Sequence, residues 1–281
     1  MVVPSFLDAD LIRVAQDLPV GPRLLVELGQ AIRNPRIDAR DVVALLRQDS
    51  SLVARIIRMA NSAAYARAEP AGSIEEAMAY IGFREVHRLV GAVAATQMAD
   101  RSLVLYGVSG PRLRENALFT AVIMEELAGV AGEEPRSCYT VGLLRSIGKM
   151  AIEEIAQSDA AATVFAASGE KALDVWEQQS WGVTNCEVAE HILRHWRLPH
   201  ETVSAIRHHY HPAGLHNPVI HLLNLAAGSA EHRGHGLPGE ETFWVFAPEY
   251  FAKAGVDPRE FQSVTERAQR TFQRLVTAAG T

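Results

Sequence analysis

Histidine is the residue type in this sequence with the clearest potential for chemistry. Ten of the 11 histidines lie between His191 and His235, and only His87 lies outside that window. Histidine is a common metal ligand and the usual proton carrier near neutral pH. A catalytic metal site is therefore the first hypothesis that this cluster suggests.

The best-spaced part of the cluster is Glu187, His191 and His195, which fall at i, i+4 and i+8 and so share one helix face. The spacing resembles that of zinc proteases only superficially, because the glutamate that should follow the first histidine as general base is missing. We favour a solvated helix face. Adventitious binding of nickel or zinc is the second alternative, and a catalytic metal is the third.

The elements that must position these residues are helical, because apolar residues recur at helical spacing almost throughout and alternating runs are nearly absent. Capping boxes at Ser73-x-x-Glu76 and Thr184-x-x-Glu187 mark two helix starts, and Gly82 is placed to end a helix in a left-handed conformation. We expect an all-α, compact multi-helix fold. The expected helices cover residues of about 7–18, 22–33, 39–46, 50–60, 74–81, 83–98, 112–130, 137–155, 185–196, 199–209, 218–232 and 258–275.

Composition excludes several classes of protein. The chain has 281 residues and is 48% hydrophobic, which rules out a disordered chain, and its net charge of −6 argues against binding nucleic acid through phosphates. It has no apolar run long enough to span a membrane and no signal-peptide pattern at its start. Cys138 and Cys186 are too few for a disulfide framework. We therefore expect a cytoplasmic protein.

Five local patterns, in order, resemble the HDOD domain, the HD-related output domain of bacterial signalling proteins. They are Leu18-Pro19, the run QDSSLVARIIRMANSAAY, SIEEA leading to Ile81-Gly82, GLLRSIGK, and WRLP followed by AIRHHYHP. The signature positions are Pro19, Asp49, Asn61, Ser62, Gly82, Gly142 and Gly148.

The resemblance implies an HDOD domain over residues 1–233, with an N-terminal helical lobe at about 6–106 and an HD-like lobe at about 111–233. A glycine-rich connector follows at 234–241. We expect residues 234–281 to form a helical extension that packs on or beside the HD-like lobe.

Resemblance to the HD superfamily implies a possible metal-dependent phosphohydrolase, with metal-ligand positions that can be checked one by one. Where that superfamily carries His-Asp in G-L-L-H-D-I-G-K, this sequence has Arg145-Ser146. A guanidinium has no lone pair for a metal and would repel a dication. The other positions hold Asn116, Cys186 and, by a loose alignment, Asn224, so only His208-His209 survives. We expect no catalytic residue, no bound metal, no cofactor and no enzyme activity; a residual phosphohydrolase is the least favoured alternative.

The same positions suggest a binding site for an anion. Arg145 with His208 or His209 could hold a phosphate or a nucleotide. Adjacent helical residues point about 100° apart, so at most one of the two histidines faces the cavity. We favour the simpler interpretation, in which the histidine is packed and hydrogen-bonded and Arg145 pairs with Glu115 or another inward acid.

The resemblance therefore predicts a non-enzymatic regulatory or adaptor protein in bacterial signal transduction. We expect it to bind a signalling protein supplied in trans, with a cyclic-di-GMP enzyme as one candidate, because the sequence contains no sensor, receiver, GGDEF or EAL domain. We expect no nucleic-acid or membrane partner. An aromatic-rich patch in the extension is expected to pack on the core; the alternative is an oligomer or partner surface. The patch comprises Phe243, Trp244, Phe246, Tyr250 and Phe251.

Overall fold

The computed structural model describes residues 8–17, 20–32, 38–65, 70–98, 100, 102–157, 162–165 and 172–279. Within these ranges the secondary structure is helical, apart from one isolated bridge between Leu103 and Val108. The prediction of an all-α fold is confirmed. No helix in the described ranges is long and apolar enough to cross a membrane. The signature residue Pro19 lies outside the described residues.

The α-helices and short helical turns follow one another along the chain with short connections. They are α1 (Asp8–Asp17), α2 (Val20–Ile32), α3 (Ala39–Leu46), α4 (Ser50–Ala60), η1 (Ala63–Tyr65), α5 (Ile74–Met98), α6 (Gly110–Ala131), α7 (Pro135–Leu144), α8 (Ile147–Ala156), α9 (Leu173–Trp181), α10 (Asn185–His195), α11 (His200–His208), α12 (Pro218–Ala230), η2 (Glu231–His235), η3 (Glu241–Phe243), α13 (Pro248–Ala254) and α14 (Pro258–Ala279).

Side-chain caps explain several helix starts. The carboxylate of Asp49 accepts hydrogen bonds from the backbone at the start of α4, and Thr184 and Glu187 form the predicted capping box of α10. At the start of α5, Ser73 Oγ accepts from the backbone N–H of Glu76, but Glu76 reaches back to the N–H of Gly72 instead of that of Ser73.

The next two signature residues lie at the end of α4. The Asn61 amide bridges the following loop: Nδ2 donates to the Ala71 carbonyl at 2.9 Å, and Oδ1 accepts from the Ala71 N–H at 2.7 Å. Ser62 is buried beside it, and its hydroxyl has no hydrogen-bond partner among the described residues. Asn61 therefore fixes the loop between α4 and α5.

Two helix boundaries differ from the expected ones. Gly82 has φ 79° and ψ 164°, so it kinks α5 in a conformation that essentially only glycine adopts, and it is not the left-handed helical end that we expected. The prediction of a single helix over residues 137–155 is wrong, because the chain turns at Arg145 and Ser146 and forms two helices, α7 and α8. The apolar periodicity continues across this corner, because both helices are buried on most sides.

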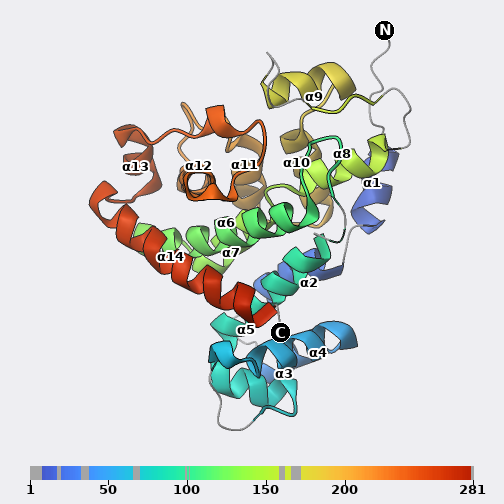
Figure 1. Cartoon of the computed structure of the whole chain (residues 1–281), viewed down its shortest axis with the longest axis vertical. Helices are drawn as coiled ribbons and strands as arrows, with labels where there is room; N and C mark the ends of the chain where they lie inside the picture. The colour runs from blue at the N-terminus through green and yellow to red at the C-terminus, as the bar shows by residue number, and fades with distance from the viewer. Residues whose placement is uncertain are drawn as a thin grey trace.

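The helices pack around one continuous apolar core (Figure 1). α6 lies along α7 at the centre, α12 and α14 pack on α6, and α10 packs against α8 and α11. α3, α4 and the start of α5 form the lower end of the molecule, and α9 lies at the opposite end (Figure 1). α1 packs against α8 and α10, so it lies on the helices of the expected HD-like lobe.

A partly buried network of ion pairs joins α5, α6 and α14. The guanidinium of Arg88 in α5 lies 2.6 Å from Glu125 and 3.1 Å from Glu126 in α6. Arg274 in α14 lies 2.9 Å from Glu85 in α5. The C-terminal helix is thus tied by charge as well as by apolar packing to the helices that carry the site.

Candidate functional site

Arg145 and Ser146 form the corner between α7 and α8, and each is only 1% exposed. The signature glycines on either side let neighbouring helices approach closely. A Cβ on Gly142 would lie 2.7 Å from Cα of Ala121 in α6, and one on Gly148 would lie 1.8 Å from a backbone oxygen of α10. These close contacts bring α6, α8 and α10 together around the Arg145 side chain.

The guanidinium of Arg145 is paired with the buried carboxylate of Glu240. Nη1 donates to Oε1 at 3.1 Å and Nη2 donates to Oε2 at 2.9 Å, which is the two-point geometry that suits a guanidinium. Nη2 also donates to Oδ1 of Asn116 at 2.6 Å. Arg145 therefore has an inward acid. That acid is not Glu115, which lies 3.4 Å from Nδ1 of His235.

Lys149, one turn further along α8, shares the same carboxylate. Its Nζ bonds to Oε1 of Glu240, and the hydroxyl of Tyr210 donates to that oxygen at 2.7 Å. Lys149 is 1% exposed and Glu240 is fully buried, so two buried cations face one buried carboxylate. We call this group the charge cluster; it consists of Asn116, Arg145, Lys149, Tyr210 and Glu240.

Glu240 and Arg145 remain ionised at neutral pH. Burial alone would raise the pKa of Glu240, but the charges and hydrogen bonds of Arg145 and Lys149 outweigh it and hold that pKa well below its usual range. Burial alone would lower the pKa of Arg145, and Glu240 reverses that effect. Removing Glu240 would therefore leave two uncompensated cations in the interior.

A tight loop after η2 carries Glu240 into the interior. Gly239 precedes it with φ +81°, and a Cβ at that position would lie 2.4 Å from the ring of Phe165. The sequence of residues 234–241 resembles an ordinary glycine-rich connector, and nothing in it singles out Glu240. The signal that could have found it is the pair Arg145 and Lys149 on consecutive turns of buried helices, because buried cations need a buried acid.

Asn224 is fully buried, and its side-chain amide forms hydrogen bonds with backbone groups. Nδ2 donates to the carbonyls of His209 and Phe243 at 2.8 and 2.9 Å, and Oδ1 accepts from the N–H of Val245 at 3.2 Å. The side chain thus joins α11 and α12 to the segment that follows Glu240. Asn224 supports the loop that closes the site.

Of the two adjacent histidines, only His209 points inward. It is fully buried, its Nδ1 lies 2.8 Å from the carbonyl of Ile206, and its ring stacks on Trp244 at 6.1 Å. Burial, aided by the charge of Arg145, lowers the pKa of His209 to about 3. His208 is half-buried and lies outside the charge cluster. His209 is therefore a neutral packed side chain at physiological pH.

Cys186 and Ser146 border the same region but make few polar contacts. Cys186 is buried with its Sγ 4.0 Å from Nδ1 of His209, and burial raises the pKa of the thiol well above its usual range. The hydroxyl of Ser146 has no hydrogen-bond partner among the described residues. The structure thus gathers Asn116, Arg145, Ser146, Cys186, His209 and Asn224 into one region and leaves His208 at its edge.

The histidine face of α10 is separate from this region. Glu187 completes the capping box and lies 2.8 Å from the guanidinium of Arg207, while His191 is half-buried and His195 is exposed. No group of three or more His, Cys, Asp or Glu side chains in the described part of the chain is arranged to hold a metal ion.

A second buried acid, Glu177, adjoins the charge cluster. It accepts a hydrogen bond from the Tyr106 hydroxyl at 2.8 Å, and from the backbone and side-chain nitrogens of Asn185 at 2.8 and 3.0 Å. Burial raises the pKa of Glu177 to about 7, against the opposing effects of its Asn185 hydrogen bonds and of Lys149. Glu177 therefore changes its ionisation near neutral pH.

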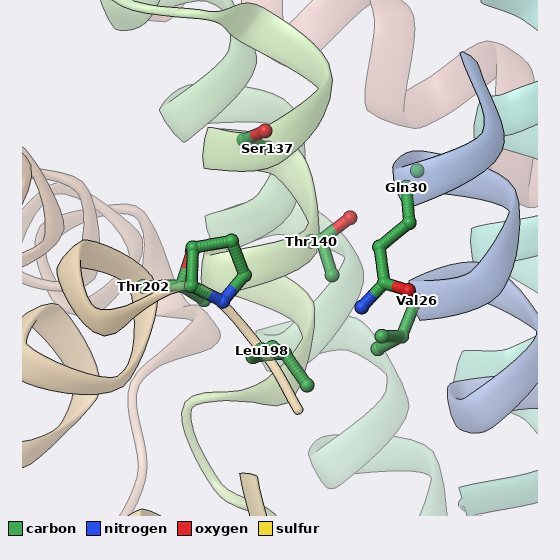
Figure 2. A pocket seen from close by; sticks show the side chains of 8 residues that line it. Val26, Gln30, Ser137, Thr140, Leu198 and Thr202 are labelled. Carbon is green, nitrogen blue, oxygen red and sulfur yellow. The ribbon is translucent and has the colours of Figure 1, made fainter. Parts of the chain in front are cut away.

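A small cavity lies where α2, α7 and α11 pack together (Figure 2). Gln30, Thr140, Leu198 and Thr202 point toward it from three sides (Figure 2). Its free volume of about 30 Å³ is enough for one or two water molecules. It is too small for a substrate or a cofactor.

Comparison with known proteins agrees with this arrangement of helices. The structure resembles that of a protein from Shewanella amazonensis that is provisionally named a phosphohydrolase, with TM-score 0.66, 23% identity and 97% of each chain covered. It also resembles a protein from Marinobacter aquaeolei that is provisionally named a signal transduction protein, with TM-score 0.71 and 22% identity over 97% of this chain and 65% of that one. At these identities the likeness concerns the fold alone.

An uncharacterised protein of Treponema pallidum is 26% identical over 217 residues, which are 75% of this chain and 41% of that protein. The chain thus spans less than half the length of this relative. The model of the HDOD domain matches residues 18–212, which is more than half of the chain and includes the α7–α8 corner. Glu240 lies beyond the matched residues. The chain belongs to the HDOD domain family.

Proposed function

We propose that this protein is a non-enzymatic regulatory adaptor in bacterial signal transduction and acts by binding a partner protein. The observation that carries the proposal is the ion pair between Arg145 and Glu240 at the corner where the HD superfamily places its metal-binding dyad. The fixed guanidinium of Arg145, at the position of the dyad's histidine, disfavours a dication at this place. Its charge is balanced by the Glu240 carboxylate of the chain itself.

The alternatives fit these contacts less well. In an anion sensor, the ligand would have to displace the carboxylate of Glu240, which already accepts hydrogen bonds from Arg145, Lys149 and Tyr210. A residual phosphohydrolase would need metal ligands from a region in which His209 is packed, with its Nδ1 against the Ile206 carbonyl, and Asn116 and Asn224 are engaged in hydrogen bonds within the protein. A protein that acts by binding a partner needs neither the displacement of Glu240 nor the release of these side chains as metal ligands.

The partner we propose is a signalling protein supplied in trans, and an enzyme that makes or degrades cyclic-di-GMP is the first candidate. Affinity purification from cells that produce the tagged full chain, with the tag alone as control, tests this proposal. We expect one signalling protein to be enriched and then to bind the purified chain directly in a two-component titration. Recovery of no such protein in several growth conditions would overturn the adaptor function.

A further inference from the structure

A second cavity, of about 370 Å³, lies between the end of α12, η2 and the first half of α14. None of its lining residues belongs to the charge cluster. We call it the Arg233 cavity; its main lining residues are Ser229, His232, Arg233, Phe246, Phe261 and Thr265.

The cation at the rim is held in place without an acid. Arg233 is exposed, and its Nη2 donates to Oγ1 of the buried Thr265 at 2.9 Å. Among the described residues, no carboxylate lies within ion-pair distance of this guanidinium. Glu266 is the neighbouring acid on α14, but it accepts from Gln262 at 3.1 Å and does not line the cavity. The charged lining is therefore cationic.

The opposite wall is aromatic and held by its neighbours. The ring of Phe246 is 37% exposed and rests on Gly228, where an added Cβ would lie 2.8 Å from the ring. Phe261 and His232 contact it edge-on, at centroid distances of 5.9 and 5.0 Å. Val245, which is 36% exposed, extends the apolar surface beyond the cavity. Such a wall costs little ordering entropy when a ligand packs on it.

The aromatic-rich patch of the extension thus has two parts. Phe243 and Phe251 are buried in the core, as expected for packing, while Phe246 is exposed beside the cavity. Exposed aromatic residues next to an arginine are typical of the residues that dominate protein interfaces.

The volume and charge define the ligand. The cavity is near the lower limit of small-molecule sites, so it suits one large side chain and a neighbouring polar group better than a whole nucleotide. One guanidinium matches one carboxylate, whereas phosphate recognition uses clusters of arginines. An acidic residue beside an apolar anchor provides both parts.

We propose that the Arg233 cavity is the place where this protein holds its partner. It takes an aromatic or large aliphatic side chain of the partner against Phe246 and Phe261, while an adjacent aspartate or glutamate pairs with Arg233. This inference rests on the proposed adaptor function and names the surface that performs it.

Selection of a displayed library of random 12-residue peptides against the purified full chain tests the inference. We expect enriched peptides to carry an aromatic or large aliphatic residue next to an acid. Arg233→Ala and Phe246→Ala should each weaken the enriched peptides at least about tenfold, and Arg233→Glu should select basic peptides instead. Arg270→Glu, an exposed change on α14 outside the cavity, is the matched control and should keep the original preference.

Thermal unfolding of each variant distinguishes a lost contact from a lost fold, and the reversed preference of Arg233→Glu cannot result from unfolding. Enriched peptides that bind Arg233→Ala and Phe246→Ala as well as the unchanged chain would overturn this inference and leave the adaptor function standing. Enriched peptides without an acidic residue, or no enrichment at all, would also overturn it; the adaptor function is then judged by the purification experiment alone.

Discussion

Glu240 forms a two-point ion pair with Arg145, 95 residues earlier in the chain, with nitrogen–oxygen distances of 3.1 and 2.9 Å. One partner lies inside the matched HDOD range and the other lies outside it. The loop that carries Glu240 is therefore an integral part of the fold. It ties the C-terminal segment to the α7–α8 corner.

Removal of the Glu240 carboxylate is expected to be strongly destabilising. Glu240→Ala leaves Arg145 and Lys149 buried without an acid, and breaking a buried pair in this way costs about 3–5 kcal/mol. Urea unfolding monitored by circular dichroism measures the loss. Glu27→Ala is the control, because Glu27 is exposed on α2 and should change stability by less than about 0.5 kcal/mol. Equal losses in the two variants would contradict the role of the ion pair.

Lys149→Met should lower the free energy of unfolding by less than Glu240→Ala does. After this change Arg145 still pairs with Glu240, so one cation faces one carboxylate, and methionine can fill most of the space of the lysine stem. We expect a loss of about 1–2 kcal/mol by the same measurement, because only a charge-assisted hydrogen bond disappears. A loss as large as that of Glu240→Ala would mean that Lys149, and not Arg145, is the main partner of the carboxylate.

Gly239→Ala tests the loop that positions Glu240. The new methyl group would face a positive φ and would lie 2.4 Å from the ring of Phe165, so both backbone strain and a clash are expected. Gly214→Ala is the matched control: Gly214 has φ +80° and nothing within 4 Å of an added Cβ. We expect the free energy of unfolding to fall by about 1 kcal/mol in the control and by at least about 2 kcal/mol in Gly239→Ala. Similar losses would show that the contact with Phe165 does not constrain the loop.

Glu177 predicts a pH dependence of stability. Its pKa is raised from 4.5 to about 7 by burial, so the folded state binds this proton more tightly than the unfolded chain. The contribution of Glu177 to the free energy of unfolding is fully present below pH 4.5 and is lost as the pH rises through 7, a change of about 3 kcal/mol at most. Glu240, His87 and His209 have lowered pKa values, so their contributions have the opposite sign and are lost as the pH falls below the unfolded values of 4.5 and 6.5. The effect of Glu177 is therefore seen as a difference between two proteins.

The stability of the unchanged chain minus that of Glu177→Gln should therefore fall between pH 5 and pH 8, measured by urea unfolding of both proteins at each pH. Gln can keep its oxygen on the two Asn185 donors and turn its amide nitrogen to the Tyr106 hydroxyl, which can accept as well as donate, so the packing is retained. Glu249→Gln, on the exposed side of α13, should leave the pH profile unchanged. A Glu177→Gln profile parallel to that of the unchanged chain would show that another group titrates.

The sequence was sufficient for the fold class and for most helix starts, because caps such as Asp49 and Thr184 act locally. It failed at the corner between α7 and α8, where burial on several sides hides the break in periodicity. The chemistry of Arg145 was enough to show that its side chain cannot serve as a metal ligand. Its partner could not be identified, because Glu240 is brought there by a loop whose path depends on tertiary contacts with Phe165 and Asn224.

We propose that a closed ion pair occupies the corner where a hydrolase would bind metal, so that the protein binds a partner and does not turn over a substrate. The most direct test is to assay the purified full chain with Mn²⁺ against a panel of phosphodiesters that includes cyclic dinucleotides. Glu240→Gln is tested beside it. We predict no turnover above the metal-only blank for either protein. Turnover by the unchanged chain that requires Mn²⁺ and is lost in His209→Ala would contradict the account.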